Sequence, residues 1–490
     1  MSPPALRLRR EGEAGTWSDG DGASAPAEER ARPRGAHLRH HVRGARHHLP
    51  TLLAGKGLIG RFVYLVATQV VTVLLGLVYW TTVARLVVPN QVGLASTAMF
   101  AASLIAALGV LGLTSLVLVI LGSADEGERR AIVSTSVTLA AIVTGAIALG
   151  VWGASRFMGP SFRRIGADPV TSLLFVLGTA TFTSVTVLDA VCIGLRRGPV
   201  QLARNIVSAV LKVALAGACV LLGFKTTAGL LGAWDASMLI SVPIVPLMLR
   251  LHRHAPAYSL RQRVALIRRY GMLSLRHHLL NVAISSVAFF LPVVAALFTV
   301  PEQMAYFSMA QLVSACALLL PFLLTMSLFV ESSGDHELLR RNLRRTLPVG
   351  LGCCVLVLAV LEPGGPLVLS VFGHNYVTHG LVPLRLLLLG GLPYVAKDHF
   401  VAVRRAQERL GEAAKIGAVS TLAEIAAAAL GGWLGGLDGL CLGWLCCTVL
   451  EATYFLPRVL SVLRSPVPTP TLETELALET VALSEPNALR

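Results

Sequence analysis

The amino-acid sequence predicts an all-α, polytopic membrane protein with about 12 transmembrane helices in two six-helix bundles. Of its 490 residues, 54% are hydrophobic and 14% are charged, and the mean hydropathy is +0.69. A soluble domain carries roughly 25% charged residues, so this composition excludes a water-soluble globule. The apolar residues gather in runs of roughly 17 to 25, which is the length of helix that crosses a hydrocarbon core of about 30 Å.

These runs define the expected helices in chain order. They cover residues 62–84, 92–121, 131–154, 170–193, 204–224 and 229–250 in the first half and 275–299, 304–330, 346–362, 380–401, 413–434 and 437–457 in the second. The first run is too long for the hydrophobic core of a cleavable signal peptide, so we expect it to be retained. Because prolines break helices, Pro363 and Pro366 predict that the ninth helix ends at 362, and residues 363–379 stay unassigned.

The polar segments divide the chain into five parts. We expect a disordered, basic cytoplasmic tail at 1–58, a six-helix bundle at 59–250, a cytoplasmic linker loop at 251–274, a second bundle at 275–460 and a disordered tail at 461–490. The first tail ends in a His/Arg cluster, and its basic residues can contact anionic membrane lipids.

The arginines that give the net charge of +15 lie between apolar runs, where such residues set the orientation of the spans in the membrane. The charge therefore gives no reason to expect a nucleic-acid partner. Most loops on the side of the N-terminus are rich in arginine. The opposite loops hold few cations, namely Arg85, Arg156, Arg163, Arg164 and Lys225. By the positive-inside rule, both termini are expected in the cytoplasm of a multi-pass protein of the cell membrane.

The sequence lacks the common motifs of enzymes and ATPases. It contains no G-x-x-x-x-G-K-[ST], G-x-S-x-G or H-E-x-x-H motif, and its eight cysteines all fall inside apolar runs without metal-ligand spacing. We therefore expect no catalytic residue, no metal, no cofactor and no ATP-driven transport by this chain alone.

The two halves resemble each other at an offset of 212 residues. Val88–Gln91 then aligns with Val300–Gln303, and Gln69 in the first run aligns with Asn281 in the seventh. Because six runs separate the copies, the repeats should be parallel and related by an axis along the membrane normal, with a cavity between the bundles. This geometry is typical of transport by alternating access.

At the end of the first run the chain reads Ala-Arg-Leu-Val-Val-Pro-Asn-Gln-Val-Gly over residues 84–93. This segment, Tyr270-Gly271 before the seventh run and the 436–451 stretch resemble the polysaccharide flippases (O-antigen and teichoic-acid type, Wzx-like) of the multidrug/oligosaccharidyl-lipid/polysaccharide (MOP) exporter superfamily. The resemblance covers about residues 58 to 460. Many relatives carry an Asp-Arg pair in the seventh span, whereas this chain has Ser285-Ser286-Val287-Ala288-Phe289 there.

The resemblance implies a MATE-like fold and translocation of an undecaprenyl-diphosphate-linked oligosaccharide for cell-surface polysaccharide or lipopolysaccharide biosynthesis. The implied partners are this lipid-linked substrate, membrane lipids and polysaccharide-assembly proteins. A sugar diphosphate cannot enter hydrocarbon without losing its hydration, so the protein must offer a polar, cationic cavity open sideways to the lipid.

Polar residues inside spans are the functional candidates, because charges there are costly. The candidates for binding the substrate are Arg61, Gln69, Lys212, Arg276, Asn281, Gln311 and Arg385. The candidates for ion coupling are the intramembrane acids Asp189, Glu424 and Glu451. Each has a plainer alternative role, since arginines at membrane edges anchor orientation, amides bridge helices and buried acids pair with cations.

Three other functions remain open on the sequence. A multidrug or cation antiporter of the same superfamily would need an acidic cavity, whereas the candidate cavity charges include Lys212, Arg61 and Arg276. A membrane glycosyltransferase or polymerase would need an extramembrane loop with catalytic acids, but the longest internal loop is short and basic. A scaffold without transport would require neither the intramembrane polar residues nor the repeat.

Overall fold

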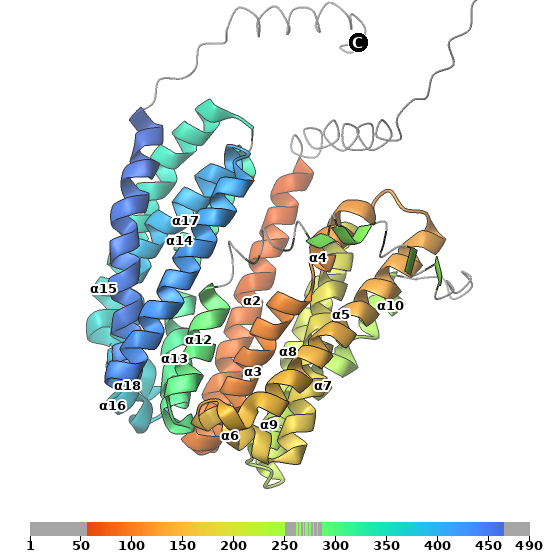
Figure 1. Ribbon diagram of the computed structural model, residues 1–490, viewed down its shortest axis with the longest axis vertical. Helices are drawn as coiled ribbons and strands as arrows, with labels where there is room; N and C mark the ends of the chain where they lie inside the picture. The colour runs from red at the N-terminus through yellow and green to blue at the C-terminus, as the bar shows by residue number, and fades with distance from the viewer. Residues whose placement is uncertain are drawn as a thin grey trace, which may run out of the picture. The chain divides into compact units, whose positions relative to one another are not determined.

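The structure is a computed structural model that describes residues 56–249, 287–332 and 334–464, with single residues between 261 and 282. Side chains are described from residue 71 onward within these ranges. Residues Arg61–Arg490 belong to one compact unit. Every element assigned in the described residues is a helix (Figure 1). The predicted tails lie almost entirely outside the described residues, and so do most residues of the linker at 251–274.

The first half contains the helices α2 to α10. Their bounds are α2 Lys56–Leu86, α3 Pro89–Gly109, α4 Leu113–Ile120, α5 Glu126–Ala154, the 3-10 turn η1 Ser155–Phe157, α6 Pro160–Ala167, α7 Pro169–Gly194, α8 Gly198–Leu221, α9 Thr227–Ser241 and α10 Ile244–Leu249. Local sequence sets several of these starts. Proline occupies the first turn of α3, α6 and α7, where its missing N–H is not needed. The Asp125 carboxylate caps α5 by accepting from the Glu128 N–H at 2.8 Å.

The second half contains the helices α12 to α18. Their bounds are α12 Val287–Phe298, α13 Pro301–Ala317, α14 Leu319–Ser332, α15 His336–Ser370, α16 His374–Leu389, α17 Gly391–Ala406 and α18 Leu410–Arg464. Helices α13 and α14 are bent by 49° at a short break, as in a broken span or a re-entrant loop. Helix α18 is two spans joined at Gly435 and Gly436, where the backbone leaves the helical region and Gly436 has a positive φ of 60°.

These helices confirm the all-α, polytopic membrane fold. Eight described helices are long and apolar enough to cross a bilayer, and the bent α13–α14 pair makes nine. The break in α18 divides it into two helices, which fall on the eleventh and twelfth predicted runs, and shorter apolar stretches at Val71–Leu86 and Phe289–Phe298 fall on the first and seventh. Each of the twelve predicted runs therefore overlaps a described helix.

The predicted break after residue 362 is wrong. Helix α15 continues through Pro363 and Pro366 to Ser370. The ring nitrogen of Pro366 cannot donate to the Glu362 carbonyl one turn earlier, but Nη2 of Arg385 in α16 donates to that carbonyl at 3.4 Å. A neighbouring helix thus satisfies the backbone group that the proline leaves free, which is how spanning helices tolerate proline.

The two halves meet between equivalent helices. Ser308 in α13 donates from Oγ to Oγ of Ser96 in α3 at 2.8 Å, and these two residues are 212 positions apart. A Cβ on Gly93 would lie 1.6 Å from the Pro301 carbonyl oxygen, so only glycine lets the backbones approach this closely. A contact between equivalent residues of two repeats lies on their symmetry axis, as the predicted two-fold relationship requires.

Further contacts join the halves at the same end of the helices, where α2 ends and α3 begins; we call it the Pro89 end. Arg85 donates from Nε to the Val371 carbonyl at 2.7 Å and from Nη2 to the Ser370 carbonyl at 2.9 Å. These carbonyls end α15, so the guanidinium lies at the negative end of that helix. Ser161 also donates to the Thr299 carbonyl at 3.4 Å. The bundles are therefore fastened together at the Pro89 end.

Candidate functional site

The first half places Lys212 beside an aromatic ring on a neighbouring helix. Its ammonium nitrogen in α8 lies 5.2 Å from the centroid of the Tyr79 ring in α2. Tyr79 is 1% exposed, and its hydroxyl has no hydrogen-bond partner among the described residues. No described acid forms an ion pair with Lys212. The ammonium and the hydroxyl thus give this region two hydrogen-bond donors without a described acceptor.

Asp189, a candidate for ion coupling, is paired with a buried arginine. Nη2 of Arg204 lies 2.7 Å from Oδ2 of Asp189, and Nε lies 3.0 Å from Oδ1. Arg204 is 2% exposed because α8 begins at Gly198, six residues earlier than the predicted run, and this places the guanidinium inside the bundle. The pair is bidentate, a geometry that fixes the ends of α7 and α8 relative to each other.

The second half holds a cluster of one lysine and two glutamates. Lys397 in α17 forms an ion pair with Glu424, which is 1% exposed, and its Nζ lies 3.6 Å from Oε2 of Glu451. Trp444 donates from Nε1 to Oε2 of Glu424 at 2.8 Å, and Lys397 Nζ lies 5.2 Å from the Tyr394 ring centroid. The Glu451 oxygens have no described hydrogen-bond partner. Glu424 is therefore satisfied on both oxygens, whereas Glu451 is not.

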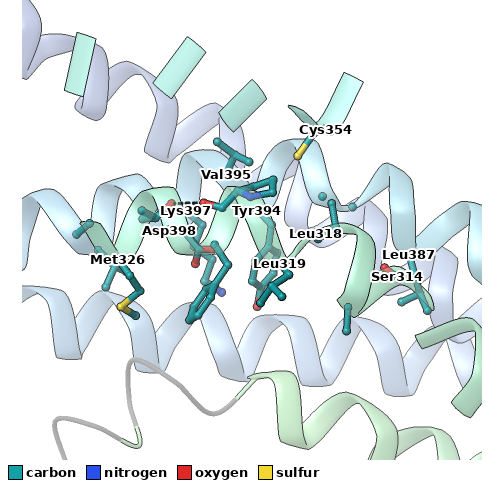
Figure 2. A pocket seen from close by; sticks show the side chains of 18 of the residues that line it. Ser314, Leu318, Leu319, Met326, Cys354, Leu387, Tyr394, Val395, Lys397 and Asp398 are labelled. Carbon is teal, nitrogen blue, oxygen red and sulfur yellow. Dashed lines mark hydrogen bonds between the residues drawn. The ribbon is translucent and has the colours of Figure 1, made fainter. Parts of the chain in front are cut away.

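A cavity of about 540 Å³ lies next to this cluster, inside the second half. Figure 2 shows Tyr394, Lys397 and Asp398 of α17 in its wall together with Leu318, Leu319 and Met326. The cavity lies at the bend between α13 and α14. Its wall is mainly apolar, with one amide, one lysine, one arginine and one aspartate among the polar side chains: Gln311, Lys397, Arg405 and Asp398.

The remaining predicted site residues have different surroundings. Gln311 lines the cavity, and its Oε1 has no described partner. Arg385 does not line it, since its Nε lies 2.9 Å from Oε1 of Glu362 in a pair whose side chains are 40% and 50% exposed. The side chains of Arg61, Gln69, Arg276 and Asn281 lie outside the described residues. Their proposed roles stay predictions, as do those of the other candidates.

The repeat gives the partly buried Lys212 and the buried Glu424 equivalent places with opposite charges. Helices α8 and α18 begin at Gly198 and Leu410, which are 212 positions apart, and the same offset relates Lys212 to Glu424. The second half supplies Lys397 as a counter-ion for Glu424. The described first half supplies none for Lys212. The two bundles thus share the same helix positions but carry opposite charges at this equivalent position.

Besides Arg204, two residues of the first half were missed by sequence reasoning. Tyr79 gave no signal, because a tyrosine in an apolar run is ordinary. Asp235 in α9 did carry a signal: it is an acid inside the predicted run 229–250, and the structure shows it 5% exposed with no described hydrogen-bond partner on either oxygen. Among the described residues no group of three His, Cys, Asp or Glu side chains is placed to hold a metal ion.

Comparison with solved structures finds the same architecture in known transporters. A multidrug resistance MATE family transporter of the MOP superfamily in an inward-facing conformation matches with a TM-score of 0.58 and 18% identity, covering 81% of this chain and 96% of that one. A multidrug resistance MATE family transporter of the MOP superfamily in an outward-facing conformation matches with a TM-score of 0.54 and 16% identity, covering 85% of this chain and 98% of that one.

A MOP superfamily transporter from Pyrococcus furiosus, described as having a binding pocket of reverse polarity that suggests a different function, matches with a TM-score of 0.54 and 18% identity, covering 83% of this chain and 95% of that one. No protein-family model and no curated protein matched the chain. The protein therefore has the fold of the MATE transporters of the MOP superfamily.

Proposed function

We propose that this protein transports a polyprenyl-diphosphate-linked oligosaccharide across the cytoplasmic membrane by alternating access, for assembly of a cell-surface polysaccharide. The proposal rests on the fold and above all on one observation: the partly buried Lys212 ammonium lies over the ring of the buried Tyr79, it forms no described ion pair, and the Tyr79 hydroxyl has no described hydrogen-bond partner. Phosphate oxygens are strong acceptors and carry the charge that an unmatched ammonium requires. An anionic head group suits this pair better than a cation does.

The chemistry of such a substrate agrees with this arrangement. Its polyprenyl tail is stable in hydrocarbon, but its diphosphate must exchange hydration for protein donors before it can cross. A lysine without a partner acid can accept the diphosphate without breaking an existing ion pair. In the second half, the amide of Gln311 and the carboxylate of Asp398 line the cavity beside apolar residues and can hydrogen-bond sugar hydroxyls.

The contacts between the halves support alternating access. Arg85 and the Ser96–Ser308 contact hold the bundles together at the Pro89 end, which the positive-inside rule assigns to the outer face of the membrane. At the opposite end of α3, Ser274 donates from Oγ to the Leu111 carbonyl at 2.7 Å, and a ring nitrogen of His278 lies 2.8 Å from the Leu108 carbonyl oxygen. Alternating access requires the contacts at the two ends to open in turn, as in a rocking of one bundle against the other.

A multidrug or cation antiporter is the second candidate function. One observation favours it: Asp235 and Glu451 are acids whose oxygens have no described hydrogen-bond partner. Cationic substrates need such acids, and two of the similar structures are multidrug resistance transporters. The two functions differ in the charge of the molecule that Lys212 must accept or repel.

The experiment is a leaflet-exchange assay in liposomes with a fluorescent polyprenyl-diphosphate sugar. Loss of one charge-assisted contact removes about 1.5–3 kcal/mol, so K212A should slow exchange by about tenfold or more. Y79F, which keeps the ring and loses the hydroxyl, should slow it less. K225A serves as the matched control, because Lys225 lies exposed between α8 and α9 and should not matter.

Thermal unfolding of the same variants separates binding from folding. Lys212 has no described counter-ion, so K212A should unfold at the wild-type temperature or above it. Unchanged lipid exchange in a stable K212A protein would remove Lys212 from the mechanism. Export of a cationic dye by the wild type, together with no movement of the lipid-linked sugar, would establish the antiporter instead.

A further inference from the structure

The first half contains a buried acid to which the proposed function assigns no role. Asp235 lies in the middle of α9, eight residues after its start at Thr227, so it is about 12 Å from the Pro89 end. Its side chain is 5% exposed, and neither carboxyl oxygen has a described hydrogen-bond partner. This combination is unusual, since buried polar groups are normally hydrogen-bonded.

A glycine on the adjacent helix makes the space for this carboxyl group. A Cβ built on Gly178 in α7 would lie 2.2 Å from Oδ1 of Asp235, and the next two atoms it would meet are the other carboxyl atoms. Any larger residue at 178 would have to displace the group. Gly178 therefore provides a niche in which the Asp235 carboxyl contacts the helix surface directly.

The charged groups of the neighbouring helices are engaged elsewhere. Helix α9 packs against α3, α7 and α8, and α3 contains no titratable side chain. On α7, Asp189 is paired with Arg204 of α8. The other titratable groups on α8 are Lys212, over the Tyr79 ring, and Cys219, whose thiol donates to the Gly229 carbonyl at 3.6 Å. Asp168, at the start of α7, caps that helix. None forms a described ion pair with Asp235.

We propose that Asp235 is a proton-binding site of the first half, protonated in the conformation described here and deprotonated when the bundle exposes it to water. An unpaired carboxylate in an apolar interior is too costly to persist, whereas a neutral carboxyl group in the Gly178 niche is not. The proton leaves to water as the carboxyl becomes a carboxylate, and it returns on closure. This inference rests on the proposed function in one respect: it takes the exposure of Asp235 to water to be a step of the transport cycle.

Such a site couples proton movement to the change of access. A group that is neutral when buried and charged when wetted makes the exposed conformation more favourable as the pH rises on the wetted side. Asp189 and Glu424 are less suited to this role because each is held by a cation in the described state. Asp235 has no such competing partner.

The test uses the full-length protein and two independent readouts. The first is infrared difference spectroscopy between acid and alkaline pH, without any transport substrate. The wild type should show a protonated carboxyl band that is absent in D235N. G178A should shift that band, since the added methyl group displaces the carboxyl. G217A is the matched control, because a Cβ on Gly217 in α8 meets no atom within 4 Å.

The second readout is transport in liposomes with and without a pH gradient. D235N should lose the pH-driven component and retain exchange without a gradient. If D235N does not fold, the G178A band shift in a folded protein still tests the niche. A D235N protein with unchanged carboxyl bands, or one that keeps full pH-driven transport, would overturn the proposal. Failure of the lipid-linked sugar to move would contradict only the proposed substrate, because the infrared measurement needs no substrate.

Discussion

At the scale of single residues, the buried charges differ in how well they are compensated. Lys397 binds Glu424 closely and Glu451 at a longer distance, and Trp444 satisfies the second oxygen of Glu424. Arg204 and Asp189 satisfy each other. Lys212 and Asp235 have no described charged partner. The compensated pairs fix helices relative to one another, whereas Lys212 and Asp235 are the residues for which we propose functional roles, because a buried ionisable group without a partner is retained only at a cost to stability.

The Lys397–Glu424 pair provides a prediction for stability. E424Q should lower the free energy of unfolding by about 3–5 kcal/mol, because it leaves a buried ammonium without its main counter-ion and turns one of two acceptor oxygens into a donor. The control is E362Q, since the Arg385–Glu362 pair is about half exposed and contributes about 0–1 kcal/mol. Thermal unfolding in detergent measures both. Equal effects of the two substitutions would show that burial does not determine how much each ion pair contributes to the free energy of unfolding.

At the scale of elements, helix ends depend on a few short-range contacts. Asp168 caps α7 by accepting from the Val170 and Thr171 N–H groups at 3.3 Å, and it also accepts from the Thr171 hydroxyl. The Thr171 hydroxyl bond has the largest effect on the pKa of the Asp168 carboxyl; burial, which comes next, opposes it, and the two backbone bonds add to it, so the pKa lies below its ordinary value. The charged form is therefore the one that stabilises the start of α7.

The sign of the pH dependence follows from that lowered pKa. The contribution of Asp168 is fully present above the unfolded-state pKa of about 3.9 and is lost as the pH falls through the lower folded-state value. D168A should cost about 1 kcal/mol at neutral pH, and its difference from the wild type should shrink in acid. D168N keeps an acceptor without a titrating group. A wild-type advantage over D168A that grew as the pH fell would contradict this account.

The prolines of α15 show that a contact from a neighbouring helix can offset the helix-breaking effect of proline. Pro363 and Pro366 predict the end of a helix, yet α15 continues because Arg385 donates to the Glu362 carbonyl that Pro366 leaves free. The partner is on another helix, so a single run of sequence cannot reveal it. The break at Gly435–Gly436 is different, because two glycines in sequence already indicate a place where the backbone can turn.

At the scale of the whole molecule, the α3–α13 contact on the symmetry axis defines the conformational state. Ser96 and Ser308 are 0% and 2% exposed and joined by a hydrogen bond. In a protein whose native cysteines have been replaced, oxidised S96C/S308C should therefore form a disulfide. The cross-link would hold the Pro89 end closed, so transport should stop and return on reduction. The single variants S96C and S308C are the controls, and full transport by the cross-linked protein would mean that these helices do not separate.

The candidate site was predictable only in part. Lys212, Gln311, Glu424 and Glu451 were found because a polar residue in an apolar run stands out. The burial of Arg204 was not predicted, because the predicted run 204–224 begins at this residue, but α8 begins six residues earlier and buries it. Tyr79 could not be found, since its importance comes from the ammonium on another helix and from a hydroxyl left without a partner.

The sequence alone determined the spans, their all-helical nature and the 212-residue repeat, because the length of an apolar run and its fit to a bilayer are local properties. Only the tertiary structure decided which partners the charged side chains meet. The partners of Lys397 and Arg85 are 27 and 286 positions away along the chain. Whether such groups meet depends on how the helices pack, and packing is set by contacts distributed over the whole unit. A buried charge can therefore be located in the sequence, but its partner cannot.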